Sequence, residues 1–381
     1  MDLAADVAAL IARVPREGPI DAIAALEPRL GETQDPVLRF HIAKLLGFYW
    51  LRRGDHTRAL AWNSQALQHD PADRDCAYNA LYAALHLGRF DEAAARCRAA
   101  IARFGEQPDF YDVLSASLGA AGRLAEAAVA GTRGLGLKSL QATSPAHDLS
   151  AVKVPPFDAT RPERNIIAFS LFGDRPKYTD GAVLNARAAP FVYPGWTARF
   201  YVDDSVPAPI RTALTRAGAQ VMHVGGLPSA PYGPLWRFLV ADDPSVDRYV
   251  LRDVDSLINT RERVAVDAWI ASGRHFHLMR DHFDHTELVL AGMWGGVRGA
   301  LPPVLSALRA WEAGQKALGY TADQLFLRTA LWPSIRQSVL AHDSLFAFGE
   351  VAAFPSVGGM PAGCWVGCPW HLHARKQDVL F

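Results

Sequence analysis

Two acidic residues one position apart, Asp253 and Asp255, follow the short apolar run Tyr249-Val250-Leu251. Carboxylates at the end of a strand are poorly placed for a core, but they are well placed to leave the sheet edge and hold a divalent cation. A hard cation of this kind is bound by a few carboxylates and by the oxygens of a phosphate ligand. The pattern therefore indicates a cation site for a nucleoside diphosphate, with two solvated acids in a turn as the structural alternative.

Strands and helices are predicted to alternate around this motif. Apolar runs predict strands at 166–171, 197–202, 220–224, 249–251 and 276–279, and helices are predicted at 180–189, 208–218 and 236–241. This order is typical of an open, mostly parallel α/β sheet. Ligands bind beyond the carboxyl ends of the strands in such sheets, so the Asp pair lies where a ligand is expected.

An internal repeat marks the N-terminal part of the chain. Gly54, Gly88 and Gly122 stand 34 residues apart, each before a short polar turn and a second apolar stretch with helical spacing. That spacing is the tetratricopeptide period, in which Gly ends the first helix of each pair. We expect a short array of about three such units behind an atypical N-terminal helix pair, with a generic helical bundle as the alternative.

Proline-rich sequence separates the two halves of the chain, because Pro145, Pro155, Pro156 and Pro162 fall within one short stretch. Proline at this density breaks helices and stiffens a connection. The predicted domains are a tetratricopeptide-like helical array at 1–138, a linker at 139–163 and an α/β domain at 164–381.

Composition excludes several function classes. The 381 residues contain 39 Lys+Arg and 39 Asp+Glu, so no overall charge favours nucleic acid or an anionic membrane. No apolar run approaches the ~20 residues of a membrane span, and the acidic start of the chain does not match a signal peptide. Four cysteines do not make a disulfide framework in a chain of this size. We therefore expect a cytoplasmic protein.

Residues 164–381 resemble a glycosyltransferase domain of the GT-A fold, distantly similar to glycogenin-like enzymes. The closest likeness is to bacterial proteins that join a tetratricopeptide region to such a domain. The segments that carry the resemblance are Phe169-Ser170-Leu171-Phe172-Gly173, Phe200-Tyr201-Val202-Asp203, Leu251-Arg252-Asp253-Val254-Asp255-Ser256, His277-Leu278-Met279-Arg280-Asp281-His282, Ala291-Gly292-Met293-Trp294-Gly295-Gly296 and Asp323-Gln324.

The resemblance implies a set of donor-binding residues. Asp255 would bind Mn²⁺ or Mg²⁺ directly, Asp253 would contact the metal or the ribose, and Arg237 would contact the diphosphate. The base would lie among residues that could equally belong to the core or to loops, namely Ser170, Phe172, Asp174 and Tyr178. His371 or His373 would supply a third metal ligand, although the glycogenin motif is absent there. A zinc site made with Cys364 and Cys368 is the alternative.

Catalytic roles follow from the same resemblance. Asp281 would contact the hydroxyls of the donor sugar, and Asp281, Asp323 or Glu350 would act as the general base of an inverting enzyme. Gln324 would lie under the anomeric carbon of a retaining enzyme, while Asp323 could instead cap a helix. The segment from Gly292 to Gly296 is interpreted as a tight stretch where sugar or acceptor approaches the backbone, or as a bulge or turn.

The function expected from these residues is a metal-dependent glycosyltransferase that uses a nucleotide sugar, with UDP-sugars favoured over GDP-sugars. The acceptor would be a glycan, a lipid-linked saccharide, or a protein or peptide bound by the helical array, which could also bind a partner protein or a second copy of the chain. A non-catalytic tetratricopeptide scaffold with a degenerate nucleotide-sugar-binding domain is the alternative. A nucleotidyltransferase is less favoured, because the first strand is followed by the single glycine Gly173.

Overall fold

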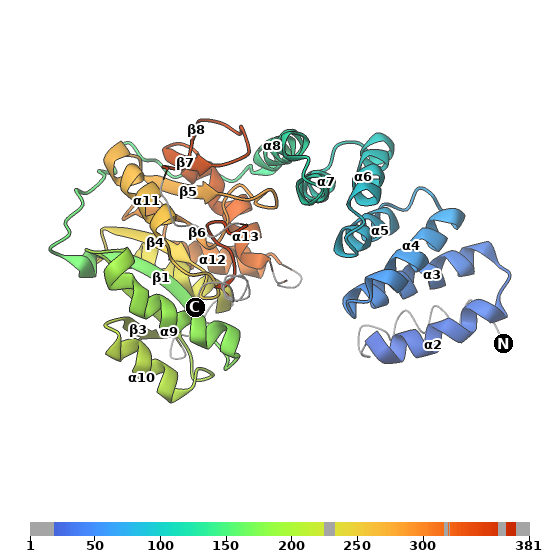
Figure 1. The fold of residues 1–381 in the computed structure, drawn as a ribbon, viewed down its shortest axis with the longest axis horizontal. Helices are drawn as coiled ribbons and strands as arrows, with labels where there is room; N and C mark the ends of the chain where they lie inside the picture. The colour runs from blue at the N-terminus through green and yellow to red at the C-terminus, as the bar shows by residue number, and fades with distance from the viewer. Residues whose placement is uncertain (1–18, 225–232, 316–318, 320, 357–362, 371–381) are drawn as a thin grey trace. The chain divides into compact units, whose positions relative to one another are not determined.

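The computed structural model describes residues 19–224, 233–315, 319, 321–356 and 363–370. The contacts divide the chain into a first unit, residues 1–137, and a second unit, residues 138–381. The first unit is helical (Figure 1), and its helices are α2 (Pro19–Glu32), α3 (Pro36–Arg52), α4 (His56–His69), α5 (Arg74–His86), α6 (Phe90–Phe104), α7 (Pro108–Ala120) and the beginning of α8 (Leu124–Gln141).

The 34-residue repeat is confirmed by identical turns between the paired helices. Gly54, Gly88 and Gly122 have φ angles of 78°, 72° and 77°, a left-handed conformation that disfavours any side chain. Each glycine follows the first helix of a pair, and its N–H donates to a carbonyl three residues earlier at 3.0 Å. The N–H of the next residue donates to a carbonyl five residues earlier at 2.8–3.0 Å. These bonds close the first helix, and the second helix begins within two residues.

Small residues allow the helices of a pair to approach closely. A Cβ added at Gly47 of α3 would lie 2.5 Å from the side-chain nitrogen of Asn63 in α4. Buried alanines recur on the inner faces of the later helices, including Ala80, Ala93 and Ala127. The array therefore packs by small-residue contacts, as the repeat predicts.

The second unit is built around one mixed sheet. The described strands run in the spatial order β3-β2-β1-β4-β6-β5-β7-β8. All neighbouring pairs are parallel except those of β6, which is antiparallel to both β4 and β5. The strand bounds are β1 (Asn165–Leu171), β2 (Thr197–Val202), β3 (Gln220–His223), β4 (Arg248–Arg252), β5 (Phe276–Arg280), β6 (Met293–Val297), β7 (Val339–Asp343) and β8 (Val351–Ala352).

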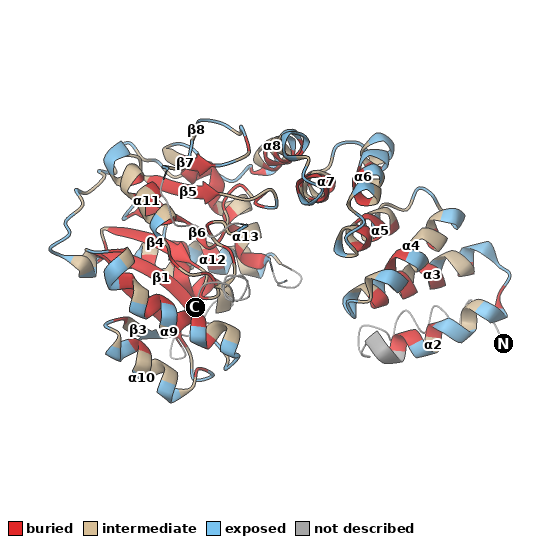
Figure 2. Ribbon diagram, in the orientation of Figure 1, coloured by how far each residue is buried: buried red, intermediate tan, exposed pale blue. Residues whose placement is uncertain are grey.

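Helices cover this sheet, and every residue of β1, β4, β5 and β6 is buried (Figure 2). The helical elements of the unit include η3, which packs against β1, and α13, which packs against η3. Their bounds are η2 (Pro162–Arg164), α9 (Pro176–Val192), α10 (Ala208–Arg216), η3 (Gly233–Asp242), α11 (Thr260–Ser272), α12 (Val304–Ala313), α13 (Ala322–Phe326), the π-helical η4 (Leu327–Leu331) and α14 (Trp332–Ile335).

The segment from Gly292 to Gly296, interpreted as a tight stretch approached by sugar or acceptor or as a bulge or turn, is a turn only at Gly292, because Met293–Val297 forms the antiparallel strand β6. The glycines are required there by the neighbouring strand. A Cβ at Gly295 would lie 2.6 Å from the carbonyl oxygen of Tyr249, and one at Gly296 would lie 2.7 Å from the Tyr249 hydroxyl. The low side-chain content thus reflects strand packing rather than an exposed loop.

Residues 142–161 belong to the second unit and contain no helix or strand, yet they are bonded to its sheet region. The guanidinium of Arg248 donates to the carbonyl oxygen of Pro155 at 3.1 Å, and the His275 ring bonds to the carbonyl of Val152 at 2.8 Å. The proline-rich segment is therefore attached along the sheet unit.

Candidate functional site

The Asp pair lies directly beyond β4, and its first acid is held by a buried arginine. Arg237 of η3 is 4% exposed, and its guanidinium forms an ion pair with Asp253. The same guanidinium donates to the carbonyl oxygen of Arg252 at 3.1 Å and to a carboxylate oxygen of Asp323 in α13 at 3.0 Å. Arg237 therefore joins β4, η3 and α13 beneath the motif.

Burial and charge shift the pKa values of this cluster in a consistent way. Burial lowers the pKa of Arg237, but the charges of Asp253 and Asp323 more than offset that effect and leave the pKa above its ordinary value. Burial raises the pKa of Asp323, the Arg237 charge lowers it, and the nearby Asp253 raises it, with a net upward shift. Arg237 thus stays charged, and the Asp323 carboxyl has a pKa above its ordinary value.

This arrangement differs from the expected role of Arg237. We expected its guanidinium to contact a diphosphate, and the structure uses both terminal nitrogens on protein acceptors. Its backbone N–H is also used, because it donates to the hydroxyl of Ser170 at the end of β1 at 2.9 Å. The buried Nε of Arg237 has no hydrogen-bond partner among the described residues. Arg237 thus positions Asp253, and its contact with a diphosphate stays a prediction.

The second acid, Asp255, is paired with Lys177 at the start of α9, with 2.8 Å between the ammonium and a carboxylate oxygen. Lys177 was not identified from the sequence, since nothing in its spacing links it to a motif 78 residues away. Its ammonium also lies 5.1 Å from the ring centroid of Tyr178. A basic side chain therefore lies at each acid of the motif.

The C-terminal segment lies against the same motif. The N–H of Trp370 donates to the carbonyl oxygen of Asp255 at 2.7 Å, and Ser256 donates its hydroxyl to the carbonyl of Gly367 at 2.7 Å. The indole N–H of Trp370 donates to the carbonyl of Lys177 at 2.8 Å. Residues more than 100 positions apart are thereby joined at the end of β4, where a tight contact leaves no room for a Cβ at Gly181.

The two histidines predicted as metal ligands, His371 and His373, lie outside the described residues, directly after Trp370 in the sequence. Within the described ranges, no group of three or more His, Cys, Asp or Glu side chains could hold a metal ion. The described part of the chain thus offers two carboxylates, Asp253 and Asp255, and these hard oxygen donors fit Mg²⁺ or Mn²⁺ completed by phosphate oxygens. Cys364 and Cys368 form no disulfide with any described residue.

Asp281 follows β5, and all four of its lone-pair positions are used. Arg261 donates to both carboxylate oxygens at 3.0 and 2.8 Å, the Ser344 hydroxyl donates to Oδ1, and the Val366 N–H donates to Oδ2 at 3.0 Å. The expected base or sugar-contacting role does not fit this saturated carboxylate. Asp281 instead fixes the C-terminal segment to the end of β5.

Gln324, in contrast to Asp281, has a side-chain acceptor that is not hydrogen-bonded. Its side-chain oxygen Oε1 is buried and has no hydrogen-bond partner among the described residues. Its backbone N–H donates to Asp323 at 2.9 Å, so the two residues predicted together are adjacent to the Arg237 cluster. A buried acceptor without a partner costs about 1–3 kcal/mol unless a ligand or water satisfies it.

The residues expected around the base lie at the end of β1 and the start of α9. The Ser170 hydroxyl donates to the carbonyl of Pro234 at 3.3 Å. Phe172 is 43% exposed and meets the Trp236 ring edge-on, with centroids 5.7 Å apart. Asp174 is exposed and Tyr178 is half-buried. Phe172 is thus an accessible ring beside the Ser170–Arg237 contact. Glu350, the other candidate base, is not part of this cluster and forms an exposed ion pair with Arg274.

Two contacts of the site had no clear signal in the sequence. Gly292 belongs to a segment that the sequence singled out, but its contact with the motif was not predicted: a Cβ there would lie 2.0 Å from Oδ2 of Asp253. That contact depends on the strand order, which places β6 beside β4. The second contact is that of Arg261 of α11 with Asp281. Among the described residues, no helix combines the length and apolar character needed to cross a membrane.

No protein-family model and no curated protein sequence matches the chain. Solved structures with partial likeness include residues 41 to the end of MamA from Desulfovibrio magneticus RS-1, with 19% identity over 36% of this chain and 76% of that chain, at a TM-score of 0.32. YrrB, described as a TPR protein with an unusual peptide-binding site, has 15% identity over 36% of this chain and 69% of that chain, at 0.33. A mutant O-GlcNAc transferase of Thermobaculum terrenum has 17% identity over 66% of this chain and 46% of that chain, at 0.41. At these scores the likenesses carry no argument about function.

Proposed function

We propose that the protein is a metal-dependent glycosyltransferase that moves a sugar from a nucleotide sugar to an acceptor, with its sheet unit as a GT-A domain. One observation carries the proposal. Side chains and backbone from α9, η3 and the C-terminal segment converge on Asp253-Val254-Asp255 at the end of β4, and α13 holds the Arg237 of η3 through Asp323. A pair of acids in a solvated turn would not need three separate elements to fix it.

The roles follow from the surroundings of each group. Asp253 and Asp255 would hold Mn²⁺ or Mg²⁺, which when bound would neutralise charge on the departing nucleoside diphosphate. Arg237 and Asp323 keep Asp253 in place. Phe172 offers an exposed ring to the base, for which a UDP-sugar is favoured over a GDP-sugar. The third ligand, His371 or His373, remains part of the proposal.

Gln324 is the candidate for contacting the donor sugar, because its buried Oε1 has no partner in the described part of the chain. A sugar hydroxyl donating to this oxygen would remove the cost of leaving it unsatisfied. The acceptor is a saccharide, a lipid-linked saccharide, or a protein or peptide held by the helical repeats, which could also hold a second copy of the chain.

The test is release of nucleoside diphosphate from UDP- and GDP-sugars with and without Mn²⁺. Removing the acid that binds the metal should remove several kcal/mol of transition-state stabilisation, so Asp255→Ala is expected to lose about 100-fold or more in turnover. Asp267→Ala is the matched control, because Asp267 is also paired with a basic residue, Arg263, but lies on α11. Equal turnover of wild type and Asp255→Ala would contradict the proposal. Absence of metal-stimulated release from every donor would favour the scaffold alternative.

A further inference from the structure

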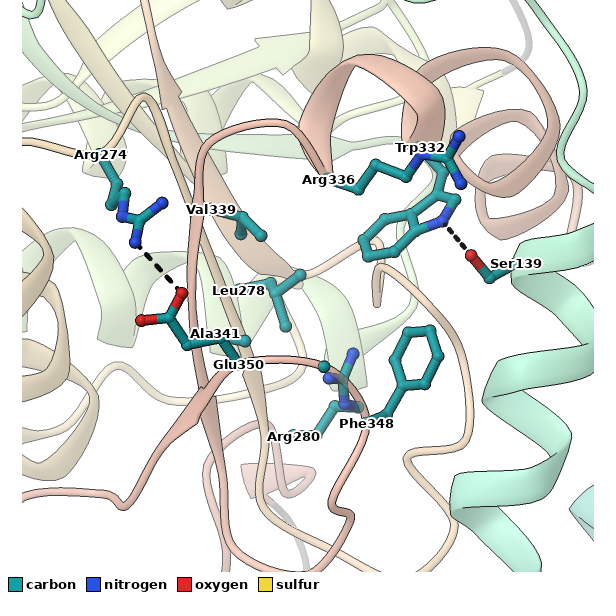
Figure 3. A pocket seen from close by; sticks show the side chains of 11 residues that line it. Ser139, Arg274, Leu278, Arg280, Trp332, Arg336, Val339, Ala341, Phe348 and Glu350 are labelled. Atoms are coloured by element: carbon teal, nitrogen blue, oxygen red, sulfur yellow. Dashed lines mark hydrogen bonds and ion pairs between the residues drawn. The ribbon is translucent and has the colours of Figure 1, made fainter.

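A cavity of about 230 Å³ lies within the second unit, over one face of β5 and β7 (Figure 3). Its apolar floor is made by Leu278 and Ala341, which are direct partners in the parallel pairing of these strands, together with Val339. The rest of the lining comes from the end of α8, the loop before β5, the end of β5, α14 with the residue after it, and the residues before β8, and includes Ser139, Arg274, Arg280, Trp332, Arg336, Phe348, Gly349 and Glu350.

Positive charge predominates in this lining. It contains three guanidinium groups, from Arg274, Arg280 and Arg336, and one carboxylate, from Glu350. Glu350 lies at the exposed rim, since its side chain is 84% exposed and pairs with Arg274 at 3.2 Å. Arg336 is exposed and forms no ion pair with any described residue. Asp343, outside the lining, neutralises Arg280, so Arg336 provides the uncompensated charge.

Arg280 is 1% exposed and still has donor capacity left. Its Nε donates to Asp343 at 2.6 Å and its Nη1 donates to the carbonyl oxygen of Leu288 at 2.9 Å. Its Nη2 makes no hydrogen bond to any residue in the described part of the chain. This N–H can therefore donate to an acceptor in the cavity that Arg280 lines.

The remaining walls combine one hydroxyl with two aromatic rings. The indole N–H of Trp332 donates to the Ser139 hydroxyl oxygen at 2.9 Å, which leaves the hydroxyl hydrogen available to donate. The rings of Trp332 and Phe348 have centroids 6.2 Å apart at an angle of 35°. Figure 3 shows Trp332, Arg336 and Ser139 on one side of the cavity and the Arg274–Glu350 pair on the other.

We infer that this cavity binds a small phosphate monoester whose organic part is planar and apolar. Arginine recognises phosphate through several N–H donors at once, and the free Nη2 of Arg280, the unpaired Arg336 and the Ser139 hydroxyl supply such donors. The volume exceeds the ~30 Å³ of one water several-fold, yet it is below the ~300 Å³ of a drug-sized pocket. The aromatic walls and the apolar strand floor accommodate the organic part. This inference does not depend on the proposed glycosyl transfer.

The test uses phenyl phosphate as the probe, with inorganic phosphate, phenol and benzoate as comparisons, in calorimetric titrations of the full chain. We expect phenyl phosphate to bind more tightly than the other three. Arg336→Met should weaken phenyl phosphate at least tenfold, because one charge-assisted hydrogen bond is lost. Arg216→Met is the control, because Arg216 is also exposed but lies on α10, and it should leave the affinity unchanged.

A second variant distinguishes binding of the phosphate group from binding of the phenyl ring. Phe348→Ala should weaken phenyl phosphate several-fold while leaving the affinity for inorganic phosphate unchanged. The inference is overturned if phenyl phosphate does not bind at millimolar concentration, if benzoate binds more tightly, or if Arg336→Met binds phenyl phosphate as the wild type does.

Discussion

Replacement of Arg237 by methionine should destabilise the sheet unit in a pH-dependent way. The substitution keeps the apolar volume but leaves Asp323 buried without its cation, and breaking a buried pair in this way costs about 3–5 kcal/mol. The contact with Asp253 adds little, because that carboxylate is 47% exposed and exposed pairs contribute about 0–1 kcal/mol. We therefore expect a loss of about 3–4 kcal/mol at pH 7.5, within the range for one buried pair.

The pH dependence follows from the pKa of Asp323, which burial already raises above its ordinary value. A carboxyl whose folded pKa is raised binds more protons when folded, so its contribution favours folding at low pH and is lost as pH rises through the folded pKa. The Arg237 charge lowers this pKa, so its removal raises the pKa further. Each added unit costs about 1.4 kcal/mol at neutral pH, and the destabilisation should shrink at pH 5.

Urea unfolding followed by tryptophan fluorescence measures this effect, because all ten tryptophans except Trp50 and Trp62 lie beyond residue 138. The control is the double variant Arg237→Met/Asp323→Asn, which removes the buried charge as well. It should regain about 2 kcal/mol at pH 7.5 and show less pH dependence than the single variant. A loss below ~1 kcal/mol in Arg237→Met, equal at both pH values and not rescued by Asp323→Asn, would refute the reasoning.

Three further changes test other parts of the structure. Gly292→Ala would place a Cβ 2.0 Å from Oδ2 of Asp253 and displace that carboxylate. Mn²⁺-dependent nucleotide binding should therefore weaken at least about tenfold, which corresponds to a loss of 1.4 kcal/mol in binding free energy. An unchanged affinity in calorimetric titration would contradict this prediction. Gly88→Ala forces a side chain into a φ of 72° and should cost about 1–2 kcal/mol, whereas Gly136→Ala, at a helical position with nothing within 4 Å, should stabilise by about 1 kcal/mol. Urea unfolding followed by circular dichroism measures the free energy of unfolding of both variants. Equal changes in this free energy would contradict the left-handed turn assigned to Gly88. Asp281→Asn loses the charge that faces Arg261 and should lower the free energy of unfolding of the second unit by about 2–4 kcal/mol. It should also speed amide hydrogen exchange at residues 366–370. Unchanged exchange at these residues would show that Asp281 does not hold the C-terminal segment.

The sequence was informative wherever local chemistry decides the structure. Gly54, Gly88 and Gly122 recur every 34 residues because each occupies the same left-handed turn, which only glycine adopts easily. The repeat could therefore be predicted without knowing any contact between residues distant in the chain. Continuous apolar runs likewise located β1 and β2, because strands covered on both faces must be apolar throughout. The position of the Asp pair at the end of β4 followed from the same reasoning.

The errors share a different physical origin, which is dependence on neighbours distant in the chain. The stretch before Val297 contains three glycines and looks like a turn, but its conformation is set by Tyr249 on the adjacent strand, whose backbone and ring leave no space for side chains. Arg237 and Asp281 carry charges that suit a ligand, yet they bond to partners 15 to 86 residues away. Residue type predicted which groups matter, whereas strand order determined whether they face a ligand or each other.

Buried ion pairs gather under the carboxyl ends of β4 and β5, and their cost suggests why they are there. Arg252 is 3% exposed and pairs with the 2% exposed Glu262 at 3.0 Å, close to the Arg237–Asp323 pair. Such pairs are often no more stabilising than apolar residues of similar volume, so they are poor means of strengthening a core. An ion pair is, however, favourable only in a narrow range of distances and orientations, so these pairs fix the position of the strand end that carries Asp253. The same charges let the site hold two acids side by side before any cation is bound, because each acid already has a basic neighbour. For the proposed cation site, binding of a divalent cation at Asp255 would be an exchange with the Lys177 ammonium rather than the filling of an uncompensated negative cluster.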